Sequence, residues 1–208
     1  MKPPTNTNGA AIKLSTKELS EETWPDFVKL FSQGNGWDHC FCVHFHRPRS
    51  LPKDQWLPTR KLRAARNRQE QKKLIDKGCS HGILIYANAD PVGWCQYGPR
   101  EELTRIDNMR TYRAPDAKIE PGEFWRITCF VVDRKYRRLG IARAALAAAL
   151  ESIKRQGGGI VEAYPVANWE GKSFGNMSTH GTVSMFKKAG FKRAAPFGNT
   201  NVVMRKKI

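Results

Sequence analysis

No apolar run in this sequence is long enough to cross a membrane, because a spanning helix needs ~20 apolar residues. The longest alanine-leucine run is interrupted by Arg143, and residues 1–9 are polar, without the apolar core of a signal peptide. Cysteine is infrequent as well. Its five scattered residues are an odd number, which argues for reduced thiols rather than a disulfide framework. These absences predict a cytoplasmic protein with no membrane partner.

Acidic side chains are also few. Nineteen Asp and Glu residues stand against 36 Lys and Arg, which gives a net charge of +17. Basic residues dominate between positions 47 and 77, and no acidic residue follows Glu170. A surface this basic attracts polyanions at long range, although cofactor phosphates or solubility account for part of the charge. Basicity alone therefore leaves nucleic acid, tRNA included, as a second candidate partner.

The chain does contain enough apolar residues to build a core. Hydrophobic residues make up 40% of the 208 positions, an ordinary share for a globular domain. We expect a single domain over residues 1–208, in which residues 1–10 are flexible. A polar segment with two prolines, 105–122, is expected to form a loop over the site. Both a monomer and a homodimer are compatible with this organisation.

A run of alternating cysteines and histidines invites a zinc interpretation: Cys40, Cys42, His44 and His46. On an extended strand the side chains of residues i and i+2 are about 6.6 Å apart, so four successive ones cannot converge on one tetrahedral ion. Half-buried thiols and histidines that line a cleft are the simpler interpretation, and we expect no metal site here.

The most informative stretch runs from Phe124 to Pro165. A β-branched run over 124–132 leads into a basic turn, then into an alanine-rich helical pattern that ends near Gln156. Three glycines and a second apolar run, 160–165, follow. Strand, turn, helix, glycine stop and strand together predict a βαβ unit.

The turn of this unit is suited to binding phosphate. Gly140 stands where the chain enters the helix, so the backbone can approach a ligand without a Cβ in the way. The first N–H groups of a helix lack internal partners and carry the positive end of its dipole, which favours an anion. Arg137 and Arg138 add positive charge just before it, and Ala142 keeps the first turn slim. An ordinary crossover helix with a basic, solvated start remains the alternative.

Two motifs resemble the GNAT acyltransferase superfamily. Arg137-x-x-Gly140-x-Ala142, directly after a β-branched strand, is similar to its Arg/Gln-x-x-Gly-x-Gly/Ala signature. The segment 181–191, which contains Phe186 and ends in Gly190-Phe191, is similar to the superfamily's closing helix. Cys40-Phe41-Cys42, Gly93-Trp94-Cys95 and Pro99-Arg100-Glu101-Glu102 resemble a branch that has no well-defined substrate.

The resemblance implies an α/β fold, of mixed α+β type, with the element order β-α-α-β-β-β-α-β-α-β-β. The expected single domain is GNAT-like: a mixed, twisted sheet of about six or seven strands, splayed between the fourth and fifth, with helices on both faces. It also implies acetyl-CoA, or another acyl-CoA, as the donor. The residues assigned to the coenzyme are Phe130, Val131, Val132, Arg137, Arg138, Leu139, Gly140, Ile141, Ala142 and Phe186.

The groups that move protons are where the chain departs from this pattern. Members often carry a tyrosine acid where Phe186 stands, and some carry a glutamate base where Arg126 or Thr128 stands. Glu162 and Tyr164 alternate on the strand after the helix and therefore share a face. We predict Glu162 as the general base and Tyr164 as the acid or orienting group. The alternative is that Glu162 only pairs with a neighbouring arginine.

These features predict an acetyl-CoA-dependent N-acyltransferase that acts on a primary amine by direct transfer from the thioester. A small-molecule amine is the first candidate acceptor. Aminoacyl-tRNA or another nucleic-acid-associated acceptor is the alternative, as is a non-catalytic polyanion-binding protein with the same fold.

Overall fold

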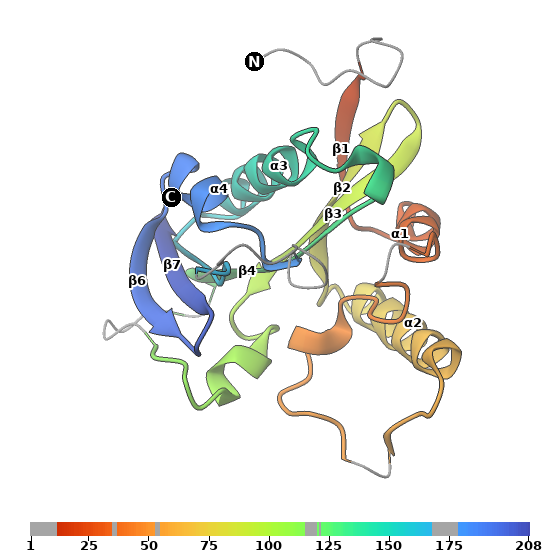
Figure 1. The fold of residues 1–208 in the computed structure, drawn as a ribbon, viewed down its shortest axis with the longest axis horizontal. Coiled ribbons are helices and arrows are strands. Elements are labelled where there is room, and N and C mark those ends of the chain that lie inside the picture. The colour runs from red at the N-terminus through yellow and green to blue at the C-terminus, as the bar shows by residue number, and fades with distance from the viewer. Residues whose placement is uncertain (1–11, 35–36, 53–54, 115–119, 121, 168–178) are drawn as a thin grey trace.

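The computed structural model describes residues 12–34, 37–52, 55–114, 120, 122–167 and 179–208. Within these residues one sheet has the strand order β1-β2-β3-β4-β5-β7-β6 (Figure 1). The strands are β1 (Leu14–Glu18), β2 (His81–Ala87), β3 (Asp90–Pro99), β4 (Phe124–Val132), β5 (Ile160–Ala163), β6 (Lys192–Phe197) and β7 (Asn201–Lys207). The helices are α1 (Trp24–Phe31), α2 (Arg60–Asp76), α3 (Ile141–Arg155) and α4 (Val183–Lys188), with short 3-10 helices η1 (Val43–Phe45), η3 (Thr104–Asn108) and η4 (Arg134–Tyr136).

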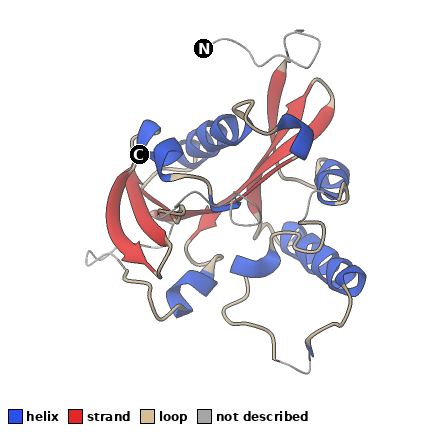
Figure 2. Ribbon diagram, in the orientation of Figure 1, coloured by secondary structure: helices blue, strands red, loops and turns tan. Residues whose placement is uncertain are grey.

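This order of helices and strands is the predicted one, and the mixed α/β fold is confirmed. Figure 2 shows helices on both faces of the sheet. The segment 1–10, expected to be flexible, lies outside the described residues. None of the helices in the described part of the chain combines the length and apolar character needed to cross a membrane.

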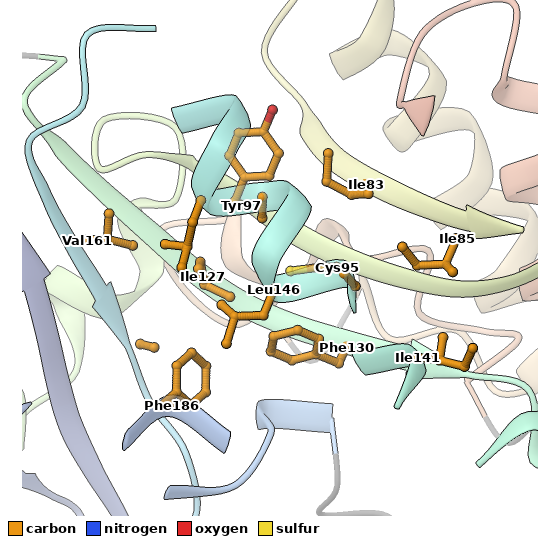
Figure 3. Close-up of a cluster of buried hydrophobic side chains, with 14 of the residues drawn as sticks. Ile83, Ile85, Cys95, Tyr97, Ile127, Phe130, Ile141, Leu146, Val161 and Phe186 are labelled. Atoms are coloured by element: carbon orange, nitrogen blue, oxygen red, sulfur yellow. The ribbon is translucent and has the colours of Figure 1, made fainter. Parts of the chain in front are cut away.

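α3 covers one face of the sheet because its apolar residues recur at helical spacing. The buried side chains of α3 are Ile141, Ala145, Leu146, Ala149, Leu150, Ser152 and Ile153. They pack against β2, β3, β4 and β5, and Figure 3 shows Leu146 beside Ile127 and Phe130. Ala142, one turn before Leu146, is only half-buried.

The opposite face carries two smaller clusters. α1 inserts Phe27, Leu30 and Phe31 against Trp94 and its neighbours on the sheet. The second cluster lies beneath η1 and η3 and consists of Phe45, Leu103, Ile106, Tyr112, Tyr164 and Val203. The face opposite α3 therefore combines the helices α1 and α2 with short segments and loops.

The sheet opens between β4 and β5. β5 pairs in parallel with Phe124–Ile127 of β4 and then ends at Ala163. β4 continues to Val132 along β3 alone, so its last five residues have a strand on one side only. The predicted splay between the fourth and fifth strands is therefore present, and it leaves an open backbone edge at Thr128–Val132.

Candidate active site

The bend between β4 and α3 is held from both ends. Asp133 donates its N–H to Val92 O at 2.9 Å, and its side chain accepts from Lys135 N at 2.8 Å. Arg138 and Gly140 both adopt left-handed backbone angles, with φ of 64° and 82°. Such alternation of backbone angles turns successive N–H groups toward one concave side, which forms an anion-binding nest.

The start of α3 offers these N–H groups to a ligand. The first bond of the helix runs from Ala144 N to Gly140 O at 3.0 Å. The N–H groups of Ile141, Ala142 and Arg143 precede this bond and carry the positive end of the helix dipole. Arg138 and Arg143 are exposed beside them. The bend can therefore receive a phosphate on backbone N–H groups within a cationic surround.

α3 sits close to the sheet at this point because Gly93 of β3 has no side chain. A Cβ at Gly93 would lie 2.3 Å from Ile141 Cγ2. Ile141, the first residue of α3, is fully buried there. The close packing fixes the anion-facing end of α3 against β3.

A bulge in β4 stands where the splay begins. Gln96 and Tyr97 of β3 pair with Cys129 and Ile127, so Thr128 is the extra residue of β4. The carbonyl oxygen of Thr128 accepts a hydrogen bond from His180 Nδ1 at 3.0 Å. A carbonyl can only accept, so Nδ1 carries the proton and Nε2 of the neutral ring is an acceptor. Burial lowers the pKa of His180, and Nε2 has no hydrogen-bond partner within the described chain.

A chain of buried amide and imidazole groups extends from this bulge. Thr128 Oγ1 donates to Gln96 Oε1 at 2.9 Å, and Gln96 Nε2 lies 3.1 Å from His46 Nε2. His46 Nδ1 is 3.1 Å from Glu102 O. Since that carbonyl oxygen accepts, His46 is protonated on Nδ1 and takes the Gln96 amide proton on Nε2. Burial lowers the pKa of His46, which keeps its ring neutral.

The two cysteine motifs meet next to this chain. Trp94 Nε1 donates to Cys42 Sγ at 3.3 Å, and Gln96 Nε2 donates to Cys42 O at 2.8 Å. Phe41 and Cys42 both have left-handed backbone angles, with φ of 46° and 50°. The segment is therefore a turn that leads into η1, and the alternation along it is not that of a strand. No cluster of three or more metal-ligating side chains was found among the residues that the structure describes.

The family model for the acetyltransferase (GNAT) family matches residues 45–171, more than half of the chain. The chain belongs to the GNAT acetyltransferase family. No curated protein sequence matches it.

Solved GNAT structures share the fold of this chain. The GNAT acetyltransferase from Streptococcus pneumoniae is 14% identical, with a TM-score of 0.53 over 94% of this chain and 99% of that one. The N-acetyltransferase PaiA from Thermoplasma acidophilum, solved with coenzyme A, is 14% identical, with a TM-score of 0.52 over 95% and 100%. YhbS from Escherichia coli, also solved with coenzyme A, is 12% identical, with a TM-score of 0.53 over 95% and 83%.

Acetyl-CoA is the donor of the GNAT family, and the geometry of this GNAT chain suits it. The bend at 137–142 offers N–H groups to a diphosphate, and the open edge of β4 at 130–132 offers backbone groups to an extended chain. These are the positions predicted for the coenzyme from the sequence. Their contacts with the ligand stay a prediction.

Phe186, the tenth residue predicted to contact the coenzyme, lies inside the core. Its ring is fully buried and packs edge-on against Phe130 at 6.0 Å and Phe191 at 5.0 Å between ring centroids (Figure 3). With no hydroxyl it cannot donate a proton.

Glu162 and Tyr164, the predicted base and acid, lie together on the face of the sheet opposite α3. Tyr164 OH donates to Glu162 Oε1 at 2.5 Å, and Arg205 Nε donates to Glu162 Oε2 at 2.6 Å. Glu162 is 0% exposed. Burial, reinforced by the charge of Glu162, raises the pKa of Tyr164 well above its usual value. The neighbouring arginine of the alternative interpretation is thus Arg205, and the catalytic roles of this pair stay predictions.

Arg126 forms a second buried ion pair on the same face. It is 0% exposed, and its two terminal nitrogens bond the two carboxylate oxygens of Asp107, each at 2.8 Å. Although burial of Asp107 acts in the other direction, hydrogen bonds from Arg126 and Arg100 lower its pKa below the usual range. Ile106 and Tyr112, from the segment expected to form a loop over the site, are buried near this pair. Residues 115–119 and 121 of that segment lie outside the described chain.

A groove of about 530 Å³ lies between α3 and α4. It contains the cations Arg143, Lys154, Lys188 and Lys206, against the single carboxylate of Glu151. Since Arg143 directly follows Ala142, the groove begins where the bend ends. The sequence analysis did not identify it.

Proposed function

We propose that this acetyltransferase moves the acetyl group of acetyl-CoA directly onto a primary amine of a small molecule. The observation that carries the proposal is the adjacency of two features: a bend with unpaired N–H groups, and an open edge of β4 that leads from it to the bulge at Thr128. The first suits the diphosphate and the second suits the pantetheine arm.

On this proposal the chain itself holds the donor in place. Residues 138–142 take the diphosphate, and the backbone of 130–132 pairs with the extended arm. The cationic groove between α3 and α4 suits the nucleotide phosphate, because four basic side chains surround it. Ordered reactants can lower a barrier by ~7 kcal/mol or more, so placement supplies a large share of the rate.

The reaction forms a bond between the amine nitrogen and the acetyl carbon and breaks the carbon–sulfur bond. The amine loses a proton and the departing thiolate gains one. Tyr164 is the proposed proton donor, because its hydroxyl carries a proton at neutral pH and lies on the same face of the sheet as Glu162.

Two groups compete for the role of base. Glu162 is the one predicted from the sequence, and both of its oxygens already accept hydrogen bonds. His180 is the one that the geometry favours, because its neutral ring is oriented by Thr128 O and its Nε2 has no partner in the described chain. We propose His180 as the stronger candidate.

The test has two steps. Acetyl-CoA at a hundredfold excess over its dissociation constant should stabilise the protein by ~2.7 kcal/mol, which thermal unfolding measures directly. A panel of amino acids, polyamines and aminoglycoside-like amines is then screened by release of free thiol. A stabilised protein that acetylates aminoacyl-tRNA and no free amine would move the acceptor to the macromolecular alternative. An absent stabilisation would contradict the proposed donor.

A further inference from the structure

α2 presents a mostly polar surface to solvent. Of its seventeen residues only Asn67, Gln71 and Ile75 are buried, and two of these are polar. It carries seven basic residues, Arg60, Lys61, Arg63, Arg66, Arg68, Lys72 and Lys73. Its two acidic residues are both neutralised, Glu70 by Arg47 and Asp76 by Lys72. The exposed surface of α2 is therefore strongly positive.

The same stretch holds the exposed apolar surface. In the part of the chain that the structure describes, the exposed large hydrophobic residues are Trp56, at 66%, and Leu62, at 47%. Trp56 lies just before α2 and Leu62 lies in its first turn. A large apolar side chain that is exposed within a cationic surface can mark a binding site.

Hydrogen bonds fix Trp56 in this position. Its Nε1 donates to Leu51 O at 3.1 Å, so the edge of the indole is engaged while its face stays open. Arg66 Nη1 donates to Gln55 O at 2.8 Å and Arg63 Nη1 donates to Leu57 O at 3.0 Å. The residues on both sides of Trp56 are thus tied to α2, and the indole is presented beside its arginines.

We propose that α2 and Trp56 form a binding surface for single-stranded nucleic acid. An unpaired base stacks on the open face of Trp56. The phosphates of the strand run along one face of α2, where they meet the cations Arg66 and Lys73. Leu62, Arg66 and Lys73 share this face because they are spaced i, i+4 and i+11 on the helix. A duplex hides its base faces and cannot use a lone aromatic platform. A membrane surface would need more than two exposed apolar side chains.

The surface lies on the side of the sheet opposite α3, next to the segment around η1. Asn67 Nδ2 donates to His39 O at 2.7 Å, and Arg47 bonds both Asn67 and Glu70, which ties α2 to the segment around η1. Figure 1 places α2 on the side of the sheet away from α3 and α4. The proposed strand therefore lies opposite the coenzyme groove and does not compete with it.

The experiment measures the anisotropy of labelled 12-nucleotide single strands, RNA and DNA, and of the matching duplexes. Trp56→Ala should weaken single-strand binding about tenfold, because base stacking on an aromatic ring is lost. Trp56→Phe keeps a ring and should retain most of the affinity. Lys73→Gln should weaken binding and reduce the slope against log salt by about 1. Arg68→Gln also removes one positive charge, but from another face of α2. It should therefore weaken binding, and reduce the salt slope, less than Lys73→Gln does.

Several results would overturn the proposal: no binding of single strands at low salt, equal affinity for single strand and duplex, or unchanged affinity in Trp56→Ala. The acetyl-CoA-dependent shift in unfolding temperature is recorded for each variant. If that shift persists while nucleic-acid binding is absent, the surface is refuted and the acetyltransferase proposal stands. The RNA and DNA arms identify which nucleic acid binds.

Discussion

The two halves of β4 differ in how many strands they pair with. Its first half, 124–127, is paired with a strand on each side, and Arg126 there is fully buried and bonded to Asp107. Its second half, 128–132, is paired on one side only. The carbonyl of Thr128 is met there by His180, whose second nitrogen has no partner in the described chain.

The difference shows how one strand can be both rigid and reactive. In the first half, the charged groups are buried and bonded to one another, so they fix the geometry of this face of the sheet. In the second half, one backbone edge is not paired with a strand, and Nε2 of His180 has no hydrogen-bond partner within the described residues. We expect substitutions in the first half to reduce stability, and those in the second half to reduce turnover.

The largest effect is expected from Arg126→Met. Removing one partner of a buried ion pair costs about 3–5 kcal/mol, and because Arg100 still bonds Asp107 we expect a loss near 3 kcal/mol in the free energy of unfolding. Chemical denaturation measures it. Lys29→Met breaks an exposed pair with Asp90 and should leave the midpoint unchanged. Equal effects of the two variants would show that burial of the Arg126–Asp107 pair adds nothing to stability.

His180→Asn should lower kcat by about a hundredfold if His180 is the base, since positioned proton transfer is worth 10² or more. Asn keeps a donor for Thr128 O, so stability should change little. Because burial lowers the pKa of His180, the ring charges only below its usual ~6.5, and wild-type activity should fall on that acid side. An acid limb that persists in His180→Asn would assign it to another group.

Gly140→Val tests the bend. A β-branched residue at φ of 82° is strained by about 1–3 kcal/mol, so acetyl-CoA should bind roughly ten- to a hundredfold more weakly in titration calorimetry. Gly198→Val introduces similar strain at a positive φ of 63° in the β6–β7 turn. It should reduce stability and leave the dissociation constant alone. Weaker acetyl-CoA binding in both variants would show that strain alone is responsible.

Glu162→Gln should lower turnover by about tenfold if the carboxylate takes part in proton transfer, a factor at the low end for such groups. Arg205→Gln is the matched change, because it breaks the same ion pair and keeps the carboxylate. If both variants lose stability equally and turnover is unchanged, Glu162 is a structural partner of Arg205.

Local sequence signals were enough to predict the central βαβ unit. The apolar spacing of α3, the glycines around it and the β-branched run of β4 are short-range patterns, and the structure has the predicted βαβ unit. The bend at Gly140 was likewise visible, because a left-handed residue before a helix favours glycine.

The side of the sheet opposite α3 was harder to predict from the sequence, because its contacts join distant segments. Gln96 is 54 residues from Cys42 and 50 from His46, and His180 is 52 from Thr128. The prediction of no zinc at Cys40–His46 used the spacing of an extended strand, whereas the left-handed backbone of Phe41 and Cys42 makes a turn. The two motifs that resemble a GNAT branch were the available signal, since Trp94 contacts Cys42.

Four consecutive residues of β3 separate the start of α3 from the Cys42 turn. Gly93 admits the start of α3 on one face of the sheet, while Trp94 and Gln96 hold the Cys42 turn on the other. If the coenzyme and the acceptor bind as proposed, their separation is set by the thickness of a single pleated strand. Insertion of one residue here would exchange the faces and move both binding regions at once.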